Sequence, residues 1–180
     1  NNVPIRVGVN SGSLEKHILV KYGSPTAEAL AESAVYNVRK LENFGFEDIV
    51  VSVKSSDVRT LVDSNRIISE TLPYPIHVGL TESGSEKLGL VKSFVAIGSL
   101  LSEGIGDTVR ISLTGSPLRE VSEGKRLLAA LGLLESRPVN IISCPTCGRT
   151  AVDIVAIVEE LERRENEMRP SRRVTVAVMG

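Results

Sequence analysis

A regular alternation of short β-rich runs with helical patterns constrains the fold of this chain more than any other feature. Four such runs begin at residues 5, 48, 76 and 108, so that successive starts lie 43, 28 and 32 residues apart. One strand and one helix in each repeat of this length are typical of a (β/α)8 barrel or of a doubly wound sheet. We therefore predict an α/β fold with parallel strands at residues 5–9, 48–53, 76–80 and 108–113.

Each predicted strand is followed by a helical pattern with an apolar stripe. The N-cap region of the first helix is expected at residues 24–26 (SPT), and Gly45 is expected to end this helix. Aromatic residues are only 3% of the chain, so small aliphatic side chains have to form the core, as is usual for parallel strands covered by helices. The stripes expected to face the strands are Leu30, Ala34, Val38 and Leu41 in the first helix, Val58, Leu61, Val62 and Ile68 in the second, Val91, Phe94, Val95, Gly98 and Leu101 in the third, and Val121, Leu128 and Leu131 in the fourth.

Four β-α units are half of a (β/α)8 barrel, and a four-stranded parallel sheet would leave exposed edges. We therefore predict the second half of a TIM-type barrel over residues 1–136, with its first half upstream. The pattern changes near residues 136–138, and residues 137–180 are predicted to form the first β-α-β of a small, truncated α+β domain. Its strands are expected at residues 139–143 and 174–178, with a helix over about 152–167 between them.

Charge and composition exclude several classes of protein. The net charge is −1, and Lys and Arg are not clustered in runs, so nucleic acid is not an expected partner. The sequence contains no apolar stretch long enough to span a bilayer and no signal-peptide pattern. Two Cys close together are not a disulfide framework. We expect a cytoplasmic protein.

Polar side chains occupy one face of the predicted strands. Because side chains alternate between the two faces of a strand, Arg6, Lys54 and Arg110 oppose the apolar residues that meet the helices. Asn10 and Ser112 share this inward face, and the carboxyl ends of barrel strands are where barrel enzymes bind substrate. Uncompensated buried charge is unfavourable, so a bound polyanion such as a phosphate is expected to balance the cations.

Alternatives remain for several of these residues. The cations could instead pair with acids elsewhere in the protein, since structural ion networks produce similar clusters. Glu82, just after the third strand, adds one carboxylate to the pocket. Residues 10–13 (NSGS) could cradle a phosphate through backbone N–H groups. His77 shares the inward parity, although a lone His is more often a hydrogen-bonded core residue.

Cys144 and Cys147 form a CxxC motif between the fifth strand and the following helix. A dithiol redox motif needs only these two residues, and a helix N-terminus favours thiolate. Zinc and an iron–sulfur cluster each need four ligands, so either would require ligands from outside this chain. Two unrelated thiols are a fourth interpretation.

Five strings in this order resemble one family: PIRVGVNSGSL (4–14), SVKSSD (52–57), HVGLTE (77–82), LSEGIGDTVRISL (101–113) and SCPTCGR (143–149). They are similar to the 4-hydroxy-3-methylbut-2-enyl diphosphate synthases of the GcpE type. The match runs over essentially the whole chain and covers about half of a typical family member, as expected for a barrel split in two.

The resemblance implies a reaction of the methylerythritol phosphate route to isoprenoids. 2-C-methyl-D-erythritol 2,4-cyclodiphosphate would be opened reductively and lose a hydroxyl, giving 4-hydroxy-3-methylbut-2-enyl diphosphate. Flavodoxin or ferredoxin would supply two electrons through a [4Fe-4S] cluster, and the full-length enzyme would be a homodimer. Cys144 and Cys147 would be two of the cluster's ligands, and the family's third Cys and its Glu belong to a motif that this chain lacks.

The same resemblance implies roles in the pocket. Five residues would hold the cyclic diphosphate, and Glu82 would be the acid near the hydroxyl that leaves as water. The five are Arg6, Asn10, Lys54, Arg110 and Ser112. Two rival functions remain: a phosphate-binding barrel without redox chemistry, resembling the pterin-condensing synthases, and a non-catalytic metal-binding fragment.

Overall fold

The computed structural model describes residues 3–82, 84–134, 139–145, 150–165, 168 and 174–179. It divides the chain into two compact units, residues 1–127 and 128–180. Both units have the α/β character predicted from the alternation of strands and helices. None of the described helices is long and apolar enough to cross a membrane.

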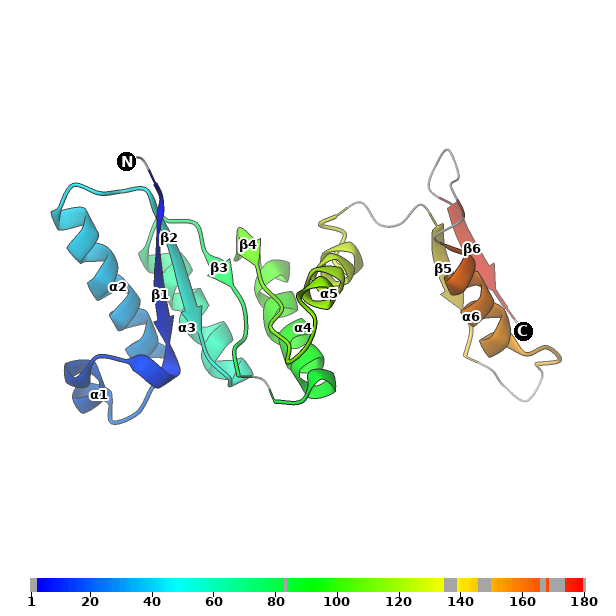
Figure 1. Ribbon diagram of the computed structural model, residues 1–180, viewed down its shortest axis with the longest axis horizontal. Helices are drawn as coiled ribbons and strands as arrows, with labels where there is room; N and C mark the ends of the chain where they lie inside the picture. Colours follow the sequence, from blue (N-terminus) through cyan, green and yellow to red (C-terminus); the bar gives the residue numbers. More distant parts are fainter. Residues whose placement is uncertain are drawn as a thin grey trace. The chain divides into compact units, whose positions relative to one another are not determined.

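The first unit contains four parallel strands that follow one another in chain order (Figure 1): β1 (Ile5–Asn10), β2 (Ile49–Lys54), β3 (His77–Val78) and β4 (Thr108–Val109). β1 pairs with β2 from Ile5↔Ile49 to Asn10↔Lys54, and β3 pairs with β4. A single bridge, Val51↔Ile76, joins the two pairs. The parallel arrangement that the repeat spacing predicts is therefore present.

The strands β3 and β4 are shorter than the predicted runs 76–80 and 108–113. Beyond Val78 the chain turns toward the end of β2, where the Thr81 N–H donates to the Ser55 carbonyl at 3.3 Å. The Arg110 N–H still donates to the Val78 carbonyl at 3.0 Å. The backbone thus continues to pair for one residue past the regular ladder, and this extension positions Arg110.

Five helices accompany these strands: α1 (Lys16–Tyr22), α2 (Ala27–Asn43), α3 (Val58–Thr71), α4 (Glu86–Ser102) and α5 (Pro117–Ala130). The Thr26 hydroxyl caps α2 by accepting from the Ala29 N–H at 3.2 Å, and Gly45 follows the helix with a φ of 71°. Both predicted boundary signals are confirmed. The short α1 was not predicted, because its seven residues contain three consecutive apolar side chains, residues 18–20, and these define no helical stripe.

The predicted faces of α4 and α5 are partly wrong. In α4, Val91 and Val95 are 60% and 53% exposed, whereas Ala96, Ile97 and Leu100 are buried. Apolar residues surround almost the whole of α4, so its sequence defines no single stripe. In α5 the buried positions are Glu123, Gly124 and Leu127, and the predicted Val121 is exposed. Both buried faces combine small residues with large ones, namely Gly89, Ser93 and Ala96 with Ile97 and Leu100 in α4, and Gly124 with Glu123 and Leu127 in α5.

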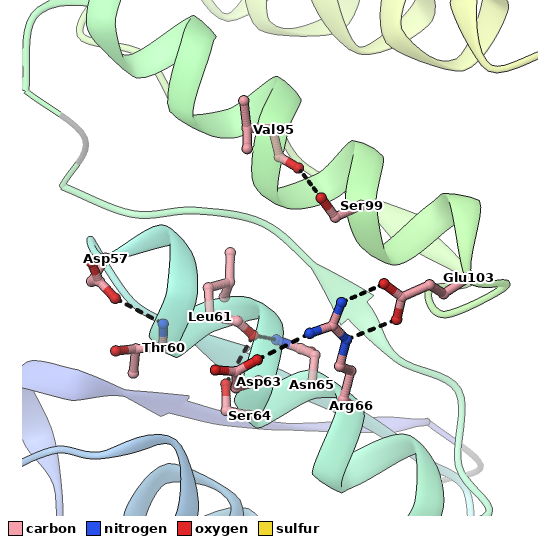
Figure 2. Close-up of polar contacts among 10 residues, drawn as sticks. All are labelled: Asp57, Thr60, Leu61, Asp63, Ser64, Asn65, Arg66, Val95, Ser99 and Glu103. Atoms are coloured by element: carbon pink, nitrogen blue, oxygen red, sulfur yellow. Dashed lines mark hydrogen bonds and ion pairs between the residues drawn. The ribbon is translucent and has the colours of Figure 1, made fainter.

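Helices α3 and α4 are joined by polar contacts at their exposed margin (Figure 2). The Arg66 guanidinium donates through Nε to Glu103 at 2.8 Å and through Nη1 to Asp63 at 3.1 Å. Asp57 caps α3 by accepting from the Thr60 N–H at 2.8 Å. Of these contacts, the one between Arg66 and Glu103 joins α3 to the end of α4.

The second unit contains two parallel strands, β5 (Val139–Ser143) and β6 (Val174–Val178), and the helix α6 (Ile154–Glu165) between them. The register runs from Val139↔Val174 to Ser143↔Val178. Both strands have the predicted bounds, and the helix lies within the predicted range. Val139, Ile154 and Val178 are buried and form its described core.

Candidate anion-binding site

The last residues of β1 and β2 lie next to each other. The parallel register places Asn10 opposite Lys54 and Gly8 opposite Ser52. Val7 and Val9 are buried while Arg6 and Gly8 are exposed, so alternation along β1 separates an apolar face from a polar one. Asn10 and Lys54 therefore stand together at the carboxyl ends of two neighbouring strands.

Arg110 is placed just beyond β4, on the same face as Thr108. Its backbone lies close to Gly79: a Cβ added to Gly79 would be 2.7 Å from the Arg110 carbonyl oxygen. Any larger residue at position 79 would displace this segment. Gly79 thus determines how near the chain carrying Arg110 comes to the chain leaving β3.

Arg6, Lys54 and Arg110, here called the cation cluster, lie within one another's electrostatic range. Half-burial is the main cause that lowers the pKa of Lys54, and the charges of Arg110 and Arg6 lower it further. Burial also lowers the pKa of His77, and the neighbouring Lys54, Arg6 and Arg110 add to the effect. Arg6 is the second residue of β1, whereas Lys54 ends β2 and Arg110 follows β4, so three different strands contribute to the cluster. Such a group of cations favours a polyanion.

Asn10 and Ser112 are the two uncharged residues predicted to bind the ligand. Asn10 Oδ1 accepts from the Gly12 N–H at 3.0 Å and closes a short 3₁₀ turn, Ser11–Ser13. The predicted phosphate cradle at residues 10–13 is therefore wrong for Gly12, whose N–H already has an acceptor. Asn10 retains its amide nitrogen as a donor, and Ser112 is half-buried in the segment after β4.

Glu82 is exposed, and the described residues form no ion pair with it. Its backbone has a φ of 52°, which makes it the one described residue other than glycine in the left-handed region. Strained backbone of this kind is concentrated at functional sites. The structure does not bring Glu82 into contact with the cation cluster, but it does mark the residue as locally unusual.

Glu120 is an acid of this site that sequence reasoning missed. Its Oε2 lies 3.6 Å from Arg110 Nε, and its Oε1 accepts from the Leu113 N–H at 2.9 Å. Glu120 occupies the first turn of α5, three residues after Pro117. The sequence did contain a signal for Glu120, namely an acidic residue in the first turn of a helix that follows a strand. Such a residue points back toward the strand end.

Cys144 lies directly after β5, and its backbone N–H donates to the Val178 carbonyl of β6 at 3.1 Å. Its thiol is half-exposed, is not in a disulfide and donates to the Pro145 carbonyl at 3.1 Å. Cys147 lies outside the described residues. The helix α6 begins only at Ile154, where the Asp153 side chain caps the Ala156 N–H at 3.0 Å. The described part of the motif therefore borders a strand end rather than a helix N-terminus.

Comparison with known proteins identifies matches along both units. The model of the GcpE TIM-barrel domain matches residues 1–125, and that of the GcpE protein C-terminal domain matches residues 140–180. The 4-hydroxy-3-methylbut-2-en-1-yl diphosphate synthase (flavodoxin) of Clostridium acetobutylicum is 53% identical over 179 residues, which are 99% of this chain and 50% of that protein.

Enzymes of the same name from other bacteria are similar to a comparable degree. The enzyme of Natranaerobius thermophilus is 52% identical over 180 residues, which are 100% of this chain and 49% of that protein. The enzyme of Geobacter sulfurreducens is 49% identical over 178 residues, which are 99% of this chain and 50% of that protein. The chain spans about half the length of these curated relatives.

Proposed function

The chain belongs to the GcpE family, and we propose on this premise that it forms the C-terminal half of a 4-hydroxy-3-methylbut-2-enyl diphosphate synthase. Residues 1–136 would be the second half of a TIM-type barrel and bind the substrate. Residues 137–180 would begin the iron–sulfur domain. By the full-length enzyme we mean this chain together with a segment that corresponds to the half of its relatives' length that the chain does not cover.

The observation that carries the proposal is the cation cluster. Arg6 lies near the start of β1, Lys54 ends β2 and Arg110 follows β4. Burial is the main cause that lowers the pKa of His77, and the charges of all three cations lower it further. A cyclic diphosphate supplies the negative charge that such a cluster favours, and guanidinium groups match phosphate oxygens in shape. Asn10 would donate its amide N–H groups and Ser112 its hydroxyl to the same ligand. A non-redox phosphate barrel would explain the cations but would leave Cys144 without a role.

In the proposed reaction, 2-C-methyl-D-erythritol 2,4-cyclodiphosphate is opened at a carbon–oxygen bond to the diphosphate and a hydroxyl leaves as water. The overall change consumes two electrons and two protons. The cation cluster holds the diphosphate and stabilises the charge that develops on its released oxygen. Glu82, on the loop after β3, is the proposed donor of the proton that the leaving hydroxyl takes up.

The chemistry of the cysteines suits an iron–sulfur cluster. Cys144 offers a half-exposed sulfur at a strand end, and Cys147 is the second thiol of the chain. Thiolates are the usual ligands of such clusters, which supply electrons that no side chain can provide. The remaining ligands would come from the rest of the full-length enzyme. We propose flavodoxin or ferredoxin as electron donor, a homodimeric enzyme and a cytoplasmic location.

Substitution of Arg110 by Ala in the full-length enzyme tests the proposal. Loss of an arginine that contacts a desolvated phosphate should weaken substrate binding by about 2–5 kcal/mol. Calorimetric titration with the cyclic diphosphate measures the change. The matched control is Arg126→Ala on α5, whose guanidinium pairs with Glu123 instead. Unchanged affinity in Arg110→Ala would remove the cation cluster from substrate binding.

A further inference from the structure

Glu120 is an acidic residue beside the cation cluster. It lies beside Arg110, and its charge also opposes the lowering of the Lys54 pKa. The side chain is only 16% exposed. A carboxylate in a site for a polyanion weakens binding through charge repulsion, so its presence in this site calls for a compensating role.

One carboxylate connects both ends of the segment from Arg110 to Leu113. Oε1 accepts from the Leu113 N–H at 2.9 Å, while Oε2 faces Arg110 Nε at 3.6 Å. Between these two points Ile111 is 2% exposed and anchors the segment in the core. The Leu113 contact prevents the carboxylate from swinging away, so Glu120 is a fixed partner for the guanidinium.

The contact with Nε leaves the other edge of the guanidinium available. Arginine has five N–H donors in a rigid fork, and its two terminal nitrogens can bind two phosphate oxygens at once. The Arg110 side chain is 55% exposed, and Glu120 is the one acid paired with it in the described part of the chain. Without that partner, a long exposed side chain would sample many rotamers and lose more entropy on binding.

We propose that Glu120 is a positioning residue, which holds the Arg110 guanidinium by its Nε edge so that its terminal nitrogens face the bound diphosphate. This inference rests on the proposed diphosphate site and adds a residue to it. Glu120 itself would not touch the ligand. Its effect on affinity would pass through Arg110, and the orientation it provides would outweigh the repulsion it adds.

Titration of the full-length enzyme with inorganic pyrophosphate tests whether Glu120 strengthens or weakens anion binding. Glu120→Gln keeps an oxygen for the Leu113 N–H but removes the charge beside Arg110. If Glu120 positions Arg110, pyrophosphate should bind about 5- to 50-fold more weakly to this variant. If Glu120 is only a counter-charge, its neutralisation should make pyrophosphate bind more tightly, and that result would overturn the proposal.

A double-mutant cycle with Arg110→Ala separates positioning from a general structural role. In the Arg110→Ala background, Glu120→Gln should cause no further loss of affinity, because the residue it positions is gone. A loss of the same size in both backgrounds would contradict the inference. Glu123→Gln is the control, since Glu123 lies one turn further along α5 and pairs with Arg119 and Arg126.

The same titrations separate the two levels of inference. If Arg110→Ala leaves pyrophosphate affinity unchanged, the proposed diphosphate site fails, and the role of Glu120 fails with it. If Arg110→Ala weakens binding but Glu120→Gln does not, only the role of Glu120 is refuted. Should Glu120→Gln not fold, Glu120→Asp keeps the charge on a shorter arm, so positioning predicts weaker binding and a counter-charge predicts no change.

Discussion

His77 is the most constrained polar residue of the candidate site. Its Nδ1 lies 2.8 Å from the Thr108 hydroxyl, and the residue is 9% exposed. Its Nε2 is buried and has no hydrogen-bond partner in the part of the chain that the structure describes. A charged imidazole would be poorly solvated there and would face the cation cluster, so the ring is held neutral.

This environment predicts a pH dependence of stability. Since the pKa of His77 is lowered in the folded chain, the unfolded chain binds the additional proton, and the unfolding free energy rises with pH. We expect stability to fall as the pH drops below about 6.5, by at most about 1.4 kcal/mol per pH unit. Urea denaturation between about pH 7.5 and 5.5 measures this slope. This pH range lies above the ordinary pKa values of Asp and Glu, so these carboxylates contribute little to the slope.

A substitution of His77 tests this assignment. His77→Gln removes the group whose pKa is lowered in the folded chain, so it should flatten the pH slope. Equal slopes for the wild type and His77→Gln would show that His77 does not titrate between the folded and unfolded states.

Glu82 gives a prediction about turnover. An amide has nearly the same shape as a carboxylic acid but cannot deliver its proton, so Glu82→Gln in the full-length enzyme should bind substrate and lose most of its turnover. Single-turnover kinetics with a chemical reductant, together with a separate binding titration, distinguish the two effects. Glu82 has no part in the mechanism if turnover stays near normal while affinity is also unchanged.

At the scale of elements, the close approach of β3 to the segment after β4 determines where Arg110 stands. A Cβ at position 79 would meet the Arg110 carbonyl oxygen at 2.7 Å, which requires the backbone to move. We expect Gly79→Ala to destabilise the chain by about 1–3 kcal/mol, the usual effect of overpacking. Chemical denaturation provides the measurement.

A glycine within a strand serves as the control for this substitution. Gly8 lies in β1, and a Cβ there would meet nothing within 4 Å. Gly8→Ala should therefore be neutral or stabilise the chain by up to about 1 kcal/mol, because alanine has fewer unfolded conformations. Equal losses at both positions would mean that contact with Arg110 is not the cause.

Elements with a distinct pattern could be predicted from the sequence, and those without one could not. The alternation in β1 and the turn residues around β5 and β6 define these strands, and Thr26 and Gly45 mark the ends of α2. The buried face of α4 could not be derived, since apolar residues such as Val91 occur on several of its sides. Its packing depends on which neighbour comes closest, and this is a tertiary property.

The candidate site shows the same division. Arg6, Lys54 and Arg110 were predicted because strand alternation places them on one face. In the structure, the charges of Arg6 and Arg110 both lower the pKa of Lys54. Glu120 was not predicted, because it belongs to a helix and reaches Arg110 only through the loop geometry after β4. Periodicity identifies residues within an element, but contacts between an element and the next loop depend on the turn that joins them.

At the scale of the whole molecule, the number of cysteines limits what this chain can hold by itself. It contains two Cys, of which Cys144 is described at the end of β5. A [4Fe-4S] cluster takes four protein ligands, usually thiolates. In the described part of the chain, no group of three His, Cys, Asp or Glu side chains is arranged to hold a metal ion. A cluster of this kind would therefore need ligands in addition to the two cysteines.

We accordingly expect that anaerobic iron–sulfur reconstitution of this chain alone gives no stable four-iron cluster and no synthase activity, whereas the full-length enzyme gains both. Visible absorption, iron content and sizing are measured together, because two chains could pool four cysteines and would then appear as a dimer. Cys144→Ser in the full-length enzyme should abolish the cluster absorption, since a hydroxyl is a poor replacement for a thiolate ligand. A brown monomer of this chain with full cluster absorption would show that ligands other than its two cysteines complete the site.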